Sequence, residues 1–72
     1  MNERQRRQAE ALGRCSFLPG SAEKRFCRDM AARAALAAPP ELTERQAAYL
    51  ERLCWRFRRQ LPAHLVPSEQ PA

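Results

Sequence analysis

The chain has 72 residues, which is one domain at most. A chain of this length has a small hydrophobic core, which can stabilise the folded state only if the helices pack economically or two copies associate as a homodimer. Lysine and arginine number 13 against 8 acidic residues, a formal charge of +5, and every cation except Lys24 is an arginine, the side chain suited to phosphate and carboxylate contacts. This balance favours nucleic acid or another acidic partner, whereas the lack of an apolar run near the roughly 20 residues of a membrane span argues against a membrane protein.

The first predicted helix covers about residues 2–12. Asn2 is a suitable N-cap, and Gly13 is a common kind of helix stop. The segment has few apolar positions, so it is weakly amphipathic and its first turns are expected to fray. We therefore expect its cations to form a flexible basic arm, which comprises Arg4, Arg6, Arg7 and Arg14.

A turn follows the first helix. The dipeptide Pro19-Gly20 is a strong turn signal. The two residues before it, Phe17 and Leu18, are large and apolar, and burying them is favourable. We therefore expect both side chains to plug the core from this loop.

The second predicted helix covers about residues 22–37. Ser21 is its expected N-cap, and the prolines that begin at Pro39 prevent it from continuing. Apolar residues recur at three- and four-residue spacing and predict one buried face. This face comprises Phe26, Cys27, Met30, Ala34 and Ala37.

The third predicted helix lies in the stretch "LTERQAAYLERLCWRFRRQLP" and covers about residues 44–60. Thr43 and Gln46 form a capping-box pattern, and Pro62 ends the segment. The apolar residues again follow helical spacing and predict the main core stripe. They are Ala47, Leu50, Leu53, Cys54, Phe57 and Leu61.

The remainder of the chain, residues 63–72, is an irregular, Pro-rich tail. We expect it to be flexible, although Leu65 and Val66 are apolar enough to dock on the domain. The sequence therefore predicts an all-α fold, with a three-helix domain over residues 1–62 followed by this tail.

The polar side of the third helix carries the most specific functional signal. Arginines recur along it as a ridge about 20 Å long at 1.5 Å per residue, and Trp55 stands beside them. The ridge predicts phosphate contacts with stacking by Trp55 or Tyr49; the alternative is the ordinary solvated face of an amphipathic helix, with Trp55 at the edge of the core. The ridge comprises Arg45, Arg52, Arg56 and Arg59.

A second group of cations lies in the N-terminal half of the second helix. It comprises Lys24, Arg25 and Arg28. A helix N-terminus with nearby cations is a candidate phosphate site. The alternative is again a solvated face, because Glu23 and Asp29 lie close by in the sequence.

Catalytic and metal chemistry are poorly supported. The one histidine, His64, and the three cysteines lack the short Cys-x₂₋₄-Cys spacing of a zinc site, and we find no phosphate loop or nucleophile–base set. We therefore expect no enzyme activity, metal or cofactor. The chain starts without an apolar leader segment, which favours the cytoplasm and free thiols. The cysteines are Cys15, Cys27 and Cys54.

Two quoted stretches, "RCSFLPGSAEKRF" and "LTERQAAYLERLCWRFRRQLP", resemble a family of small basic helical proteins of unknown function from bacteria and prophages. The resemblance spans residues 14–62. It implies a cytoplasmic accessory protein of mobile DNA that acts on nucleic acid or on a nucleic-acid enzyme, and it implies no catalytic residue.

Three hypotheses follow from the sequence. The first is a small nucleic-acid-binding protein that contacts phosphates through the arginine ridge. The second is an adaptor or inhibitor that binds an acidic protein. The third is a structural homodimer, which the small core and the alanine-rich second helix favour.

Overall fold

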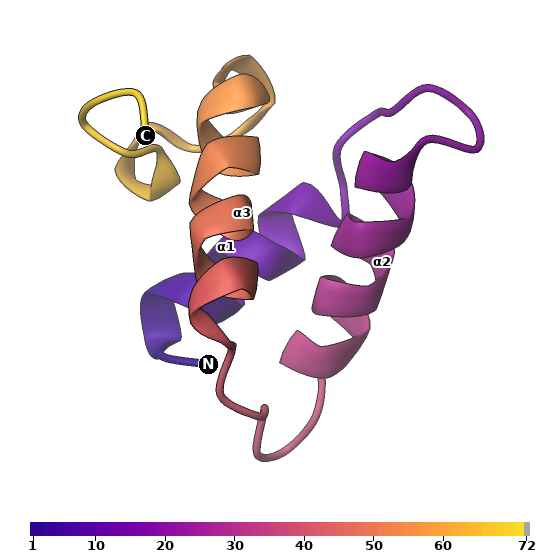
Figure 1. Ribbon diagram of the computed structural model, residues 1–72, viewed down its shortest axis with the longest axis vertical. Helices are drawn as coiled ribbons and strands as arrows, with labels where there is room; N and C mark the ends of the chain where they lie inside the picture. Colours follow the sequence, from indigo (N-terminus) through magenta and orange to yellow (C-terminus); the bar gives the residue numbers. More distant parts are fainter. Residues whose placement is uncertain (72) are drawn as a thin grey trace.

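The described part of the chain forms three α-helices, and the first helix packs against both of the others. In the computed structural model, which describes residues 1–71, Figure 1 shows α1 crossing behind α3 and reaching α2. The predicted all-α, three-helix architecture is confirmed. The helices are α1 (Glu3–Leu12), α2 (Ala22–Ala34) and α3 (Glu44–Arg56), and two 3₁₀ turns follow, η1 (Arg58–Gln60) and η2 (Ala63–Leu65).

Each helix begins where a polar side chain can cap it. Asn2 accepts a hydrogen bond from the Gln5 amide at 2.7 Å, and the Gln5 side chain accepts one from the Asn2 amide in return. Thr43 and Gln46 form the same reciprocal box on α3, as predicted. The Ser21 hydroxyl caps α2. These bonds satisfy amide groups that a helix start leaves without partners.

Helix α1 is the inner helix of the fold, which the sequence did not predict. Gln8, Ala9 and Leu12 are all fully buried. The Gln8 side-chain amide donates to the Glu51 carboxylate at 3.1 Å and to the Leu65 carbonyl at 3.0 Å, so it ties α1 to α3 and to η2. The prediction of a flexible basic arm is therefore wrong for the arginines that lie within this helix.

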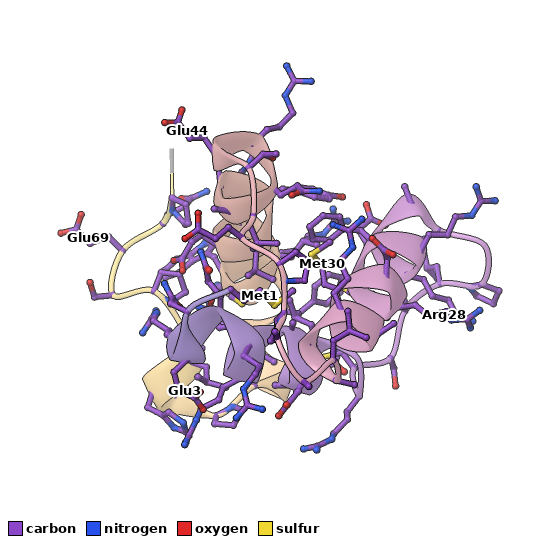
Figure 2. The ribbon with its side chains drawn as sticks, turned by 90° about the horizontal axis from the view of Figure 1, so that it is seen from below. Met1, Glu3, Arg28, Met30, Glu44 and Glu69 are labelled. Atoms are coloured by element: carbon purple, nitrogen blue, oxygen red, sulfur yellow. The ribbon has the colours of Figure 1, made fainter. Side chains whose placement is uncertain are left out.

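The buried face of α3 agrees with the predicted core stripe. Leu50, Leu53 and Cys54 are at most 2% exposed, and Leu61 joins them in one buried cluster with Leu12 and Cys27. Burial of these apolar side chains supplies the main stabilisation of the fold. A second cluster, between α1 and α2, comprises Ala9, Met30 and Ala34, with Met1 packed against it (Figure 2).

Helix α2 ends at Ala34 and not at Ala37 as predicted. In a helix, the ring of a proline clashes with the carbonyl four residues before it, so Pro39 disfavours a helix that continues through Ala35. The chain leaves the helix at Ala35, and Ala37 is exposed instead of completing the buried face. The N-terminal ammonium group then holds this connection by donating to the carbonyls of Pro39 and Pro40 at 3.2 and 2.7 Å.

Helix α3 ends at Arg56, four residues before the predicted end. Phe57 leaves the helical conformation (φ −102°, ψ 25°), and residues 58–60 continue as the tighter turn η1. Contacts with the loop before α2 account for the change. Phe57 packs edge-on against Phe17 with ring centres 4.8 Å apart, and the Gln60 side chain accepts a hydrogen bond from the Ser16 amide at 2.8 Å.

The loop before α2 differs from the prediction at one of its two apolar residues. Phe17 packs against the core as expected, but Leu18 is 81% exposed. Leu18 to Ser21 form a tight turn in which the Ser21 amide donates to the Leu18 carbonyl and Gly20 has φ +75°. Pro followed by Gly at these positions is typical of a type II turn, and this turn directs Leu18 into solvent.

The C-terminal segment packs on the domain through its first residues. Leu65, in η2, is 5% exposed, and Val66 packs against the main core cluster, as their apolar character suggested. Residues 67–71 follow as an irregular segment beside α3 (Figure 1). Within residues 1–71, no helix has the length and apolar character needed to cross a lipid bilayer.

Candidate nucleic-acid interface

The arginine ridge lies on the solvent side of α3, opposite its buried face. Arg45, Arg52 and Arg56 are exposed on the helix, and Arg59 is exposed on η1. Because α3 ends at Arg56, the position of Arg59 follows from the 3₁₀ turn and not from a continued α-helix. The ridge is therefore two linked pieces and not the single straight helix that the sequence predicted.

Most guanidinium groups of this surface have no acidic partner. Among residues 1–71, no carboxylate oxygen lies within 4.0 Å of a guanidinium nitrogen of Arg45, Arg52, Arg58 or Arg59. A guanidinium without a carboxylate partner keeps most of its five N–H donors for a ligand, although Arg58 donates one hydrogen bond to the Trp55 carbonyl. These four side chains can therefore bind an anion without first breaking an ion pair.

Arg56 is the exception within the ridge. Its guanidinium lies 3.4 Å from the Glu23 carboxylate of α2 and 5.7 Å from the centre of the Phe57 ring. The arginine side chain is still 66% exposed, so solvent screens this ion pair and leaves it weak. Arg56 can exchange Glu23 for a phosphate, although at some loss relative to an unpaired arginine.

Trp55 stands at the edge of the ridge and is half-buried. The Arg58 guanidinium lies 4.5 Å from the centre of the indole, within the range of a cation–π contact, and also donates to the Trp55 carbonyl at 2.9 Å. Arg58 is not among the site residues that the sequence predicted. The turn at Phe57 moves it onto Trp55, and no glycine or asparagine before Pro62 signals that turn.

A cleft with a volume of ≈ 360 Å³ adjoins this tryptophan. It is open on one side and combines an apolar ring with several positive charges. Such a combination can hold a flat aromatic group against the ring while guanidiniums bind a negative group beside it. The cleft is lined by Arg52, Trp55, Arg56, Arg58, Gln70 and Pro71.

Tyr49, the other candidate for stacking, is partly engaged in the core. Its ring packs edge-on against Phe26 of α2, with ring centres 4.6 Å apart. The Arg52 guanidinium lies 5.8 Å from the centre of the same ring. Tyr49 therefore supports the base of the ridge, and Trp55 is the aromatic side chain that borders the charged cleft.

Two cations of the second group line a depression of their own. Lys24 and Arg28 line a shallow depression of ≈ 160 Å³ together with Gly13 and Cys15, at the end of α1. Figure 2 shows Arg28 projecting from the side of α2 that faces away from α3. Arg25 is exposed on the same helix. Lys24 and Arg28 therefore line a depression to which no arginine of the ridge contributes.

The arginines of α1 are held by carboxylates. Glu3 lies 3.0 Å from the guanidiniums of both Arg6 and Arg7, and these hydrogen bonds lower the pKa of the Glu3 carboxyl below its usual value. Arg4 lies 3.9 Å from Glu51. This surface therefore carries less free positive charge than its arginine content suggests.

The candidate zinc ligands are not gathered at one place. Cys27 and Cys54 are buried, whereas His64 is exposed in η2. Burial raises the pKa of Cys27 and of Cys54 to about 12, so both are neutral thiols at ordinary pH. Within residues 1–71, no cluster of three histidine, cysteine or acidic side chains has a geometry that could hold a metal ion.

Comparisons with protein-family models, with curated proteins and with solved structures gave no match to this chain.

Proposed function

We propose that the protein binds nucleic acid through its phosphate backbone, and that the arginines of α3 and η1 make the contacts. The observation that carries this proposal is the set of exposed guanidiniums without carboxylate partners: Arg45, Arg52, Arg58 and Arg59. Arginine forms two parallel hydrogen bonds to a phosphate, and these charge-assisted bonds are among the stronger ones in proteins. The excess positive charge of the chain acts in the same direction.

The spacing of the arginines supports a backbone contact. From Arg45 to Arg56 the helix rises about 17 Å at 1.5 Å per residue, a length over which a nucleic-acid strand presents several phosphates. Arginines at intervals along such a line can contact successive phosphates without reading the bases. We therefore expect binding that depends little on nucleotide sequence.

Arg45 gives a further reason to expect an anionic ligand. It lies in the first turn of α3, next to Glu44. A cation at this end of a helix is disfavoured by the helix dipole, which is positive there. A bound phosphate offsets this unfavourable interaction, and in its absence the residue works against helix stability.

A salt titration tests the proposal. Binding of labelled single-stranded and duplex oligonucleotides is measured by fluorescence anisotropy over a range of salt concentrations. The affinity should fall steeply with salt, because each phosphate contact releases about one counterion. The double variant Arg52→Gln/Arg59→Gln should reduce the slope of log affinity against log salt by about two, which is about one for each arginine.

A matched control separates this surface from the general charge of the chain. The variant Arg6→Gln/Arg7→Gln removes the same charge from α1, where both side chains are held by Glu3. It should change the slope much less than the α3–η1 variant does. Affinity that does not change with salt, or equal losses in both double variants, contradicts the proposal.

An acidic protein is the second candidate partner, because one observation favours it. A cavity of ≈ 400 Å³ beside the end of α3 is lined by Leu18, Phe17, Phe57 and Arg56, among others, and Leu18 is 81% exposed there. An exposed leucine next to an arginine suits a protein surface that presents apolar and acidic groups together. Capture from extracts treated with nuclease distinguishes the two candidates. If the partner is an acidic protein, a protein should still be captured after nuclease treatment, and Leu18→Ser should abolish its capture. If the partner is nucleic acid, nuclease should abolish capture.

A further inference from the structure

The cleft beside Trp55 has features that a phosphate-binding surface alone does not need. Its ≈ 360 Å³ volume falls within the range of about 300–1,000 Å³ that is usual for small-molecule sites. One wall is the half-buried indole, and the other contributors include two unpaired arginines, Arg52 and Arg58. Phosphate contacts require only the positive charges. The cleft and the indole ring fit a ligand that also carries a flat aromatic group.

The geometry points to a single-stranded nucleic acid as the ligand, with one unpaired base seated in the Trp55 cleft and the adjoining phosphates on Arg52 and Arg58. This inference rests on the proposed function and extends it by naming the class of nucleic acid. A base within a duplex is stacked and paired, and extracting it costs a few kcal/mol. An unpaired base can enter the cleft without this cost.

The pair of Trp55 and Arg58 is already arranged for stacking. The Arg58 guanidinium lies 4.5 Å from the indole centre, and its hydrogen bond to the Trp55 carbonyl, at 2.9 Å, restricts it to this position. A guanidinium that lies over one face of an indole presents its own outer face to a base, and arginine stacks on flat rings. Because the pair is formed before the ligand binds, less side-chain freedom is lost on binding.

The remaining contributors to the cleft add polar and apolar groups from another part of the chain. Gln70 and Pro71 come from the C-terminal segment and lie against the same cleft as the arginines. The Gln70 amide offers one acceptor and two donor hydrogens, which can meet the polar edge of any base. Such contacts allow weak preferences among bases and do not require a fixed sequence.

Trp55 is the only tryptophan of the chain, so its fluorescence reports on this cleft directly. The test compares oligothymidylate and oligouridylate with a duplex that carries the same number of phosphates. Both single strands should quench the fluorescence strongly, because a base stacks on the Trp55–Arg58 pair, and the duplex should not. If only oligothymidylate or only oligouridylate quenches the fluorescence, the ligand is single-stranded DNA or single-stranded RNA, respectively, and the inference still holds.

Substitution of Trp55 gives the second measurement, with anisotropy of the labelled strands as the readout. In Trp55→Leu the ratio of single-strand to duplex affinity should fall about tenfold, which is the usual contribution of one stacked base. Trp55→Phe keeps an aromatic ring and should restore most of the ratio. Circular dichroism of both variants establishes that each one is folded.

The outcomes separate this inference from the function on which it rests. If binding depends on salt and on the arginines but the ratio is the same in the native chain and in Trp55→Leu, the base-binding cleft is wrong and the phosphate-binding surface stands. If neither single strands nor duplex bind with a dependence on salt, both are wrong.

Discussion

Helices α1 and α3 are both rich in arginine, yet their arginines are in different situations. On α1, Glu3 holds Arg6 and Arg7 at 3.0 Å each. On α3 and η1, the arginines other than Arg56 have no carboxylate of residues 1–71 within 4.0 Å. The number of arginines on a helix therefore does not identify a binding surface. Arg25 and Arg28 of α2 also have no carboxylate of residues 1–71 within 4.0 Å, so the arginines of α3 and η1 are distinguished by their line along one helix and by the tryptophan beside them.

The spacing of the acids along each helix explains the difference. Glu3 precedes Arg6 by three residues and Arg7 by four, and residues at these spacings face each other on a helix. On α3, the positions three and four residues after Glu51 are Cys54 and Trp55. Glu51 instead turns toward α1, where Gln8 and Arg4 contact it. The arginines of α3 are thus left without partners.

The largest expected effect is the loss of stability when the packing of α1, the inner helix, is disturbed. Leu12 is fully buried, so Leu12→Ala should lower the free energy of unfolding by about 2–5 kcal/mol through lost burial and an unfilled cavity. Leu18→Ala makes the same chemical change at an exposed site and should stay within about 0.5 kcal/mol. Urea unfolding measures both. Similar losses in the two variants would show that α1 is not the inner helix.

The next effect concerns the close approach of α1 to α2. A Cβ atom at Gly13 would lie 2.7 Å from the Cβ of Ala31, which is too close for either helix to accept unchanged. Gly13→Ala should therefore lower the free energy of unfolding by about 1–3 kcal/mol. Ala31→Gly alone should cost about 1 kcal/mol, because glycine is unfavourable inside a helix. Gly13→Ala should therefore cost much less in the Ala31→Gly background than in the native chain, and an equal cost in both would contradict the contact.

A smaller effect is a pair of shifts in melting temperature, which should have opposite signs for an arginine of α1 and an arginine of α3. Arg6→Gln removes a guanidinium that Glu3 and Glu10 hold, so the melting temperature should fall. Arg45→Gln removes an unpaired cation from the positive end of α3, so the melting temperature should rise. Both differences should shrink as salt is added. Equal shifts of the same sign would remove the distinction between the two sets of arginines.

The smallest effect is a dependence on pH. The hydrogen bonds from Arg6 and Arg7 lower the pKa of Glu3 in the folded protein, so the folded state favours the ionised carboxyl. This stabilisation is complete above the unfolded pKa and is lost as the pH falls through the folded pKa. The native chain should therefore be more stable than Glu3→Gln near neutral pH, and the gap should close in acid. A gap of the same size at both pH values would contradict the pairing.

Much of the fold could be predicted because the signals are local. The caps at Asn2, Ser21 and Thr43 begin the three helices where the sequence indicated, and the apolar spacing of α3 identified its buried face. The role of α1 could not be predicted in the same way. Its buried surface includes a glutamine, Gln8, whose partners are far away in the sequence, at Glu51 and Leu65.

The candidate site was predicted in part. The exposed arginines of α3 follow directly from helical spacing, because the opposite face is apolar. The cleft does not, since it depends on the end of α3 at Arg56, on the turn that brings Arg58 to Trp55, and on the return of residues 70–71. The cause of that turn is tertiary: Phe57 packs against Phe17 from a loop about 40 residues earlier.

The most direct test of the central claim follows each arginine separately. Nitrogen-15 spectra of the side-chain Nε–H groups are recorded while a single-stranded oligonucleotide is added to the labelled chain. We expect the signals of Arg45, Arg52, Arg58 and Arg59, together with the Trp55 indole N–H, to shift with the added strand, while those of Arg6 and Arg7 stay in place. Shifts confined to Arg6 and Arg7, or equal shifts of every arginine signal, would contradict it.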